Sequence, residues 1–147
     1  VNRYRPAPPA VAFIRGFGMV DGAIASSVAH DSHNVVAVGT DAALLARAIN
    51  AVVAEAGGLA AATPDAVATL PLPVAGLMSD RPAEQAAARL AEVTDLIAGP
   101  LRCPLRSPLM TLSFMGLLVL PSLKLSDLGL FDVERFAFTE VTCPTSS

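Results

Sequence analysis

Five consecutive polar residues carry most of the groups in this sequence that could do chemistry. Residues 30–34 read His-Asp-Ser-His-Asn and contain both histidines of the 147-residue chain. They lie between two apolar runs, residues 23–29 and 35–39, whose composition is typical of β-strands. Imidazole, carboxylate and hydroxyl groups in one short segment suit general acid–base catalysis or metal binding. We call residues 30–34 the polar loop.

Two familiar sites are disfavoured by the residues around this loop. The glycine-rich run 16–22 resembles a dinucleotide-binding fingerprint, but its spacing is one residue too long. A strand pattern also follows it, where such a site needs the N-terminus of a helix. Ser26, Ser27 or Ser32 could supply the serine of a catalytic triad with His30 and Asp31. However, residues adjacent in sequence seldom form that relay, and no Gly-x-Ser-x-Gly motif surrounds any of the three.

A self-contained zinc site is disfavoured as well. His30 and His33 form a His-x-x-His pair, and a closed site would need two more ligands, such as Cys103 and Cys143. These cysteines are not in the spacing of a zinc finger. We therefore predict no metal site in this chain.

The residue types alone leave a simpler interpretation in favour. Asp31, Ser32 and Asn34 readily hydrogen-bond to nearby backbone, so the polar loop is first read as a hydrogen-bonded turn. In that reading His30 is an interior histidine with its hydrogen bonds satisfied. The alternative, in which the loop faces a site, remains open at this point.

Bulk composition excludes some classes of partner. The net charge is −3, and the ten Lys and Arg residues are scattered, which argues against a nucleic-acid surface. The longest apolar run, residues 109–121, is shorter than the roughly 20 residues of a membrane helix. Two cysteines do not make a disulfide framework, and we expect a reducing, cytoplasmic setting. Because the chain does not begin with Met, we expect it to be a piece of a longer protein.

The elements expected to position the polar loop form a single α/β domain. We predict a mixed sheet of about five or six strands, packed by two or more helices. The predicted strands cover residues 11–15, 23–29, 35–39, 59–62, 67–70 and 136–142. The run 35–39 is continuously apolar, as in a central strand that is buried on both faces.

Two predicted helices separate these strands. Thr40 or Asp41 caps a helix over residues 42–56, and Asp80 caps another that ends at Gly99. Residues 109–120 fit either a short helix or a buried strand, and residues 121–133 read mostly as loop. The predicted organisation is a proline-rich tether at residues 1–10, a domain at 11–142 and a tail at 143–147.

Four ordered strings give the sequence a family resemblance. They are Gly-Ala-Ile-Ala-Ser-Ser-Val-Ala-His-Asp-Ser-His-Asn-Val-Val-Ala-Val-Gly at 22–39, Leu-Pro-Leu-Pro-Val-Ala-Gly-Leu-Met-Ser-Asp at 70–80, Pro-Leu-Met-Thr-Leu-Ser-Phe at 108–114 and Leu-Lys-Leu-Ser-Asp-Leu-Gly-Leu-Phe-Asp-Val at 123–133. Together they cover roughly residues 11–135 and resemble the C-terminal domain of bacterial adenine deaminases. One difference is that Arg3-Tyr4 stands where family members usually carry Arg-His.

This resemblance implies a two-part enzyme that hydrolyses adenine to hypoxanthine and ammonia. A metal-dependent amidohydrolase barrel precedes the domain and supplies the divalent ion, manganese or iron, whose bound hydroxide attacks C6 of adenine. None of the barrel's ligands is in this chain, so we expect the chain alone not to deaminate adenine. The expected partners are that barrel, adenine and a second copy of the chain, with no nucleic acid and no membrane.

Within such an enzyme the polar loop would face the mouth of the barrel. His30, Asp31 and His33 are then candidate accessory catalytic residues, and Ser32 and Asn34 are candidate substrate contacts. Two other functions stay open: a non-catalytic binding or structural module from a truncated gene, and a part of another purine or cyclic-amide hydrolase of the same superfamily.

Overall fold

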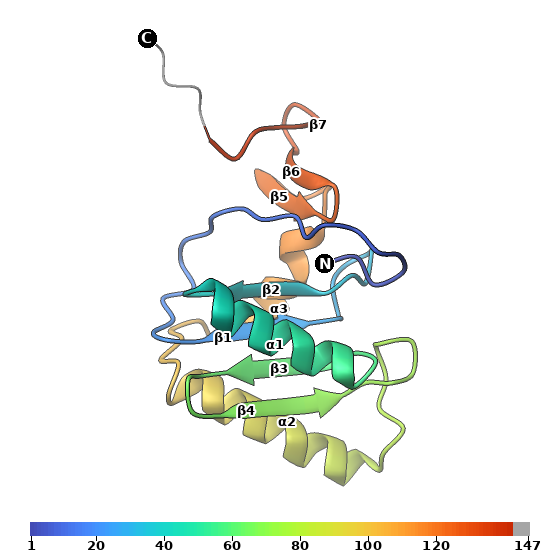
Figure 1. Cartoon of the computed structure of the whole chain (residues 1–147), viewed down its shortest axis with the longest axis vertical. Helices are drawn as coiled ribbons and strands as arrows, with labels where there is room; N and C mark the ends of the chain where they lie inside the picture. The colour runs from blue at the N-terminus through green and yellow to red at the C-terminus, as the bar shows by residue number, and fades with distance from the viewer. Residues whose placement is uncertain (143–147) are drawn as a thin grey trace.

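A four-stranded antiparallel sheet, covered by helices on both faces, forms the centre of the computed structural model, which describes residues 1–142 (Figure 1). Its strand order is β2-β1-β3-β4. A smaller sheet of order β5-β6-β7 lies beyond the β2 edge, at the top of Figure 1. The elements are β1 (Ala23–Ser26), β2 (Val36–Gly39), α1 (Ala42–Ala54), β3 (Gly58–Ala62), β4 (Val67–Pro71), α2 (Ala83–Ala98), α3 (Pro108–Ser113), the 3-10 helix η1 (Phe114–Gly116), β5 (Leu123–Ser126), β6 (Gly129–Asp132) and β7 (Ala137–Phe138).

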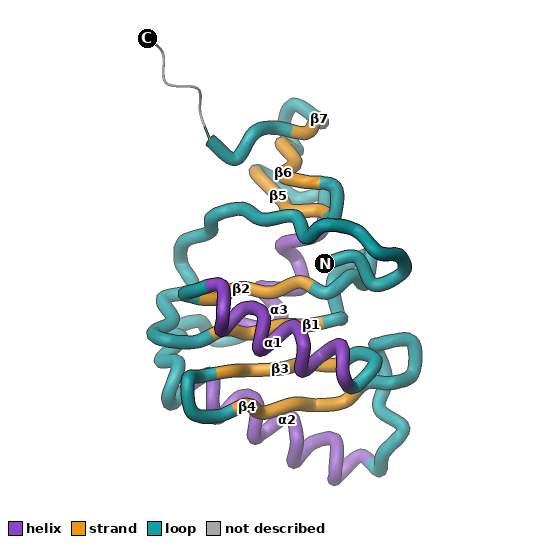
Figure 2. Tube along the Cα trace, viewed as in Figure 1, coloured by secondary structure: helices purple, strands orange, loops and turns teal. Residues whose placement is uncertain are grey.

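The central sheet is built around β1. Ile24 of β1 lies opposite Val38 of β2 on one side and Ala61 of β3 on the other, both in antiparallel register. Since β2 and β3 are each antiparallel to β1, they run parallel to one another, and α1 makes the crossover between them. The polar loop is the connection from β1 to β2, so it lies at one end of this sheet (Figure 2).

Side-chain alternation along the strands divides the core into two layers. Ala23 and Ala25 of β1 pack against α1, together with Leu44, Ala48 and Val52 of that helix. Ile24, between them, points to the opposite face and packs in a second cluster with residues of α2 and α3. Ile24 is fully buried, as expected for the middle of a three-layer arrangement.

Several predicted elements are confirmed. The α/β class and the packing helices are as expected, with the strands distributed over two antiparallel sheets rather than a single mixed one. The hairpin at residues 58–71 is present. Asp41 caps α1, because its Oδ1 accepts hydrogen bonds from the backbone N–H groups of Ala43 (2.8 Å) and Leu44 (2.9 Å). The ambiguous run 109–120 begins as a helix, α3 followed by η1.

Other predictions were wrong. Residues 11–15 form no strand, because their backbone is not paired with any described strand. The run 35–39 gives β2, which is an edge strand and not a central one. Asp80 does not cap α2, whose N-cap position is Pro82 and carries no side-chain hydrogen bond. The predicted last strand, 136–142, is reduced to β7.

The segment 121–133 also differs from the expected loop. It contains the hairpin of β5 and β6, which turns at Asp127 and Leu128. The ring of Phe131 in β6 holds the small sheet together, since it packs edge-on against Phe136 (5.4 Å between centroids) and Phe138 (5.3 Å). These contacts are recognisable only once the three strands are folded together.

Within residues 1–142 no helix has the length and apolar character needed to cross a membrane. The predicted tail at 143–147, with Cys143, lies outside the described residues.

Candidate functional site

The polar loop is a hydrogen-bonded turn. The backbone N–H of His33 donates to the carbonyl of Ala29 at 2.7 Å. His33 has φ of +48°, in the left-handed region that non-glycine residues seldom occupy. The hydroxyl of Ser32 accepts from the backbone N–H of Asn34 at 3.4 Å. The turn expected from the residue types is therefore present, and it carries the exposed side chains of Asp31 and Ser32.

The N-terminal residues of the chain hold this turn from one side. The backbone N–H of Arg3 donates to Asn34 Oδ1 at 3.1 Å. The hydroxyl of Tyr4 donates to the carbonyl of Ser32 at 3.1 Å. Val1 and Val35 exchange two backbone hydrogen bonds, of 2.7 Å and 3.0 Å. Residues 1–4 thus lie along the loop although the sequence predicts a tether there.

The loop after β4 meets the end of β1, just before the polar loop, through a buried serine. Ser27 Oγ donates to the carbonyl of Gly76 at 2.6 Å and accepts from the N–H of Gly58 at 2.8 Å. Arg3 adds a second link, because its Nη2 donates to the carbonyl of Ala75 at 2.9 Å. Two strings that are far apart in sequence, 22–39 and 70–80, therefore share one end of the sheet.

The remaining two strings approach the same place. The backbone N–H of His30 donates to the carbonyl of Ser113 at 3.0 Å, and its imidazole packs edge-on against Phe114, with centroids 4.9 Å apart. Asp127 Oδ2 accepts from the side-chain amide of Asn2 at 2.7 Å. All four strings of the family resemblance thus touch the polar loop or the N-terminal residues that hold it.

This arrangement leaves some polar groups available and commits others. The side chains of Asp31 and Ser32 are exposed at the outer side of the loop. His30 and His33 are half-buried, with their ring centroids 6.3 Å apart. His33 Nδ1 is buried and has no hydrogen-bond partner among the described residues. Asn34 is only 8% exposed, and its amide oxygen is already used by Arg3.

Comparison with known proteins confirms the family resemblance. Residues 1–137 match the adenine deaminase C-terminal domain family. The chain belongs to this family. It is 56% identical over 141 residues to an adenine deaminase of Salinibacter ruber, covering 95% of the chain and 26% of that protein. It is 51% identical over 140 residues to one of Sulfurovum sp., again covering 95% of the chain and 26% of the relative.

An archaeal adenine deaminase, from Archaeoglobus fulgidus, is 48% identical over 130 residues, which cover 88% of the chain and 23% of that protein. The chain thus spans about a quarter of the length of the curated relatives it matches. It corresponds to their C-terminal domain, and the rest of such a protein lies outside it.

The described residues of this adenine deaminase domain do not form a metal centre. No three His, Cys, Asp or Glu side chains within residues 1–142 are gathered so that they could hold an ion. Cys103, one of the two cysteines weighed as ligands, is buried, and its thiol donates to the carbonyl of Phe17 at 3.1 Å. The described residues therefore do not fit a divalent ion.

Arg3 and Tyr4 are the site residues that sequence reasoning missed. Both lie in the segment predicted to be a tether, yet both hold the polar loop. Their role depends on hydrogen bonds between residues 31 and 28 positions apart, which no local pattern in the sequence records.

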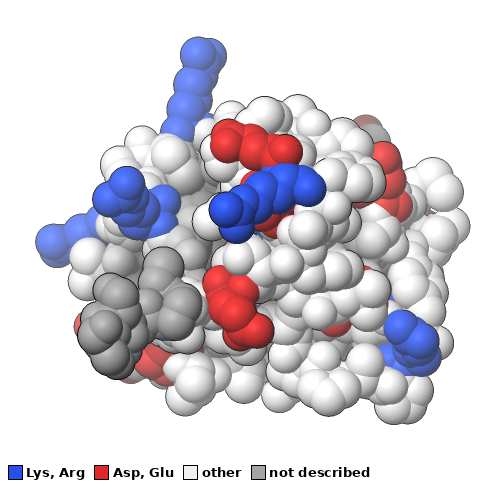
Figure 3. All heavy atoms as spheres, turned by 90° about the horizontal axis from the view of Figure 1, so that it is seen from above, with Lys and Arg blue, Asp and Glu red and all other residues white. Residues whose placement is uncertain are grey.

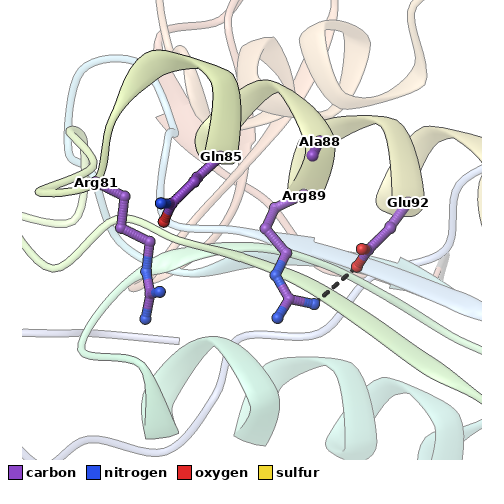
Figure 4. A pocket seen from close by; sticks show the side chains of 5 residues that line it. All are labelled: Arg81, Gln85, Ala88, Arg89 and Glu92. Carbon is purple, nitrogen blue, oxygen red and sulfur yellow. Dashed lines mark hydrogen bonds and ion pairs between the residues drawn. The ribbon is translucent and has the colours of Figure 1, made fainter.

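The pocket on α2 and the charged side chains of the described surface do not form a comparable site. A pocket of about 270 Å³ is lined by exposed side chains of α2 and by Arg81 just before it, and two of the lining residues, Arg89 and Glu92, form an ion pair of 2.8 Å along the helix (Figure 4). On the face shown in Figure 3, Lys and Arg side chains are scattered, one of them among Asp and Glu side chains, and they form no broad basic patch. The polar loop therefore remains the candidate site.

Proposed function

We propose that this chain is the C-terminal part of an enzyme that hydrolyses adenine to hypoxanthine and ammonia. The catalytic barrel and its divalent ion, manganese or iron, belong to the part of the polypeptide outside the chain. The domain, at residues 11–142, caps that barrel with its polar loop toward the barrel mouth. Such an enzyme is a cytoplasmic protein of purine salvage.

One observation carries the proposal: Asp31 and Ser32 are displayed on a turn that the rest of the domain holds in place. Three different segments hydrogen-bond to the loop or to the strand end beside it, through Arg3, Gly76 and Ser113. An ordinary surface turn needs no such support. A group that must meet a substrate does, because small displacements from the productive geometry cost much of the rate.

The roles follow from exposure and bonding. Asp31 makes no side-chain hydrogen bond or ion pair with residues 1–142, so its carboxylate is free to accept one from substrate or from a histidine of the barrel. Ser32 presents a hydroxyl beside it. His30 and His33 act as accessory acid–base or hydrogen-bonding groups at the edge of the site. Asn34 contributes by fixing the loop through Arg3.

A direct assay tests this function. Ammonia release from adenine is measured for this chain and for the full-length protein, each with added Mn²⁺ or Fe²⁺. We expect turnover by the full-length protein and none by the chain alone. Turnover by the chain alone, or a full-length protein that acts on another purine and leaves adenine intact, would overturn the proposal.

A further inference from the structure

The free edge of β2 borders a groove that a strand would fit. The groove has a volume of about 530 Å³ and runs along residues 35–39. Leu45 and Ile49 of α1 line one wall, Gly116 and Leu125 line another, and residues 9–14 lie across from the strand. Figure 1 shows the N-terminal segment passing between β2 and the small sheet, and this segment forms no strand of either sheet.

Alternation in the β1–β2 pair tells which backbone groups of β2 face this groove. The N–H of Thr40 donates to the carbonyl of Gly22 at 3.0 Å, so Thr40 is turned toward β1. In an antiparallel pair every second residue shares that orientation, which turns Val38 and Val36 toward β1 as well. Ala37 and Gly39 therefore point their N–H and C=O groups into the groove, where no described strand pairs with them.

One residue already occupies this edge. Val1 donates to the carbonyl of Val35 at 2.7 Å, and Val35 donates back to the carbonyl of Val1 at 3.0 Å. Two residues that exchange both hydrogen bonds form an antiparallel ladder pair, because a parallel ladder links each residue to two different partners. This pair fixes both the direction and the register of any chain that continues from Val1 along β2.

We propose that the residues immediately preceding Val1 in the full-length protein form a fifth strand on β2. Counting back from the Val1–Val35 pair, the second residue before Val1 lies opposite Ala37, and the fourth lies opposite Gly39. The family supplies the chain for it, since the curated relatives hold about three quarters of their length outside this C-terminal domain. The strand joins that larger part to the sheet.

The sequence of β2 and the residue before it supports this occupant. The run Val-Val-Ala-Val in residues 35–38 is continuously apolar, a pattern typical of a strand with neighbours on both sides and unusual on a free edge.

The geometry also specifies the side chains of the missing strand. Val1, Val35 and Ala37 share the α1 face of the sheet, whereas Val36 and Val38 pack on the other face. The second and fourth residues before Val1 therefore point toward Leu45 and Ile49, and the first and third point toward the opposite layer. We expect apolar residues at these four positions.

Residue-specific amide exchange by NMR tests the proposal without using activity, so it is independent of the proposed reaction. The samples are this chain and the same chain extended by the residues that precede it in the full-length protein. We expect the Ala37 and Gly39 amides to exchange at least about tenfold more slowly in the extended form. The Val36 and Val38 amides, which are bonded to β1, are the internal control and change little.

Equal exchange of Ala37 and Gly39 in the two samples would overturn the proposal. Equally slow exchange would mean that residues 11–15 or a second copy of the chain cover the edge, and equally fast exchange would mean that nothing does. A substitution pair gives a second readout. Ala37→Pro removes the outward N–H and no hydrogen bond to β1, so it should lower the urea midpoint of the extended form more than that of this chain, whereas Val38→Pro should destabilise both forms. A loss with Ala37→Pro that is equal in both forms would contradict the strand.

Discussion

The backbone N–H of Arg3 donates to the side-chain oxygen of Asn34 at 3.1 Å and so connects the start of the chain to the polar loop. The guanidinium of the same arginine reaches the carbonyl of Ala75, in the loop after β4. One residue therefore links two of the four strings that carry the family resemblance. This link makes the position of the loop dependent on the N-terminal segment.

Asn34→Ala should destabilise the fold. Asn34 is 8% exposed, and its loss leaves the N–H of Arg3 without an acceptor in a partly buried place. We expect the free energy of unfolding to fall by about 1–3 kcal/mol in urea titrations of this chain. Asn50→Ala, on the exposed face of α1, is the matched control and should stay within about 0.5 kcal/mol of the parent. Equal effects of the two substitutions would contradict a structural role for Asn34.

Ser27→Ala tests the hydrogen bonds that connect the end of β1 to the loop after β4. The Ser27 hydroxyl is fully buried and serves both Gly58 and Gly76, so its removal leaves a buried N–H and a buried carbonyl without their partner. We expect a loss of about 1–3 kcal/mol in the free energy of unfolding. Ser122→Ala is the control, because its exposed hydroxyl bonds only Glu134. A loss at Ser27 no larger than at Ser122 would show that the link is dispensable.

These two links also show what the sequence could and could not predict. Local patterns were sufficient for α1 with its Asp41 cap and for the hairpin of β3 and β4, because capping and turn formation depend on residues close together in the chain. The bond between Ser27 and Gly76 spans 49 positions, and no local pattern records it. The polar loop was recognised as a turn, whereas its support by Arg3 and Tyr4 depends on tertiary contacts.

The error over β2 has a different origin. Its apolar run predicts a central strand, but in this chain it lies at an edge. With the proposed fifth strand in place, the same run would be central. The pattern then reports on the sheet of the full-length protein rather than on the sheet of this chain alone.

The isolated chain should self-associate. Several large apolar side chains are exposed, above all Phe13 (91%) on the N-terminal segment, and surfaces of this kind are usually covered by a partner. Sedimentation velocity over a range of concentrations should show dimers or larger species, and Phe13→Ser should reduce them. A monomer at every concentration would contradict this expectation.

His30→Ala and His33→Ala address the accessory role of the histidines in the full-length protein. If the rings act on substrate or on groups that touch it, each change should lower kcat for adenine by about 10²-fold or more. The melting temperature should fall much less, although His30 also packs on Phe114. His30→Phe keeps that packing and should still lose activity. Parallel losses of turnover and stability in both alanine variants would favour a purely structural turn.

The central claim is that the polar loop faces the substrate, and its two exposed residues test this claim most directly. In the full-length protein, kcat/KM for adenine is measured for the double variant Asp31→Asn/Ser32→Ala. The control is Asp65→Asn, which lies in the turn between β3 and β4 at the opposite end of the sheet. Neither loop side chain is buried, and the only hydrogen bond lost is the long one, 3.4 Å, from the Asn34 N–H to the Ser32 hydroxyl, so the melting temperature should fall little. We predict a loss of about tenfold or more in kcat/KM for the loop variant and none for the control. An unchanged kcat/KM in the loop variant would contradict the account.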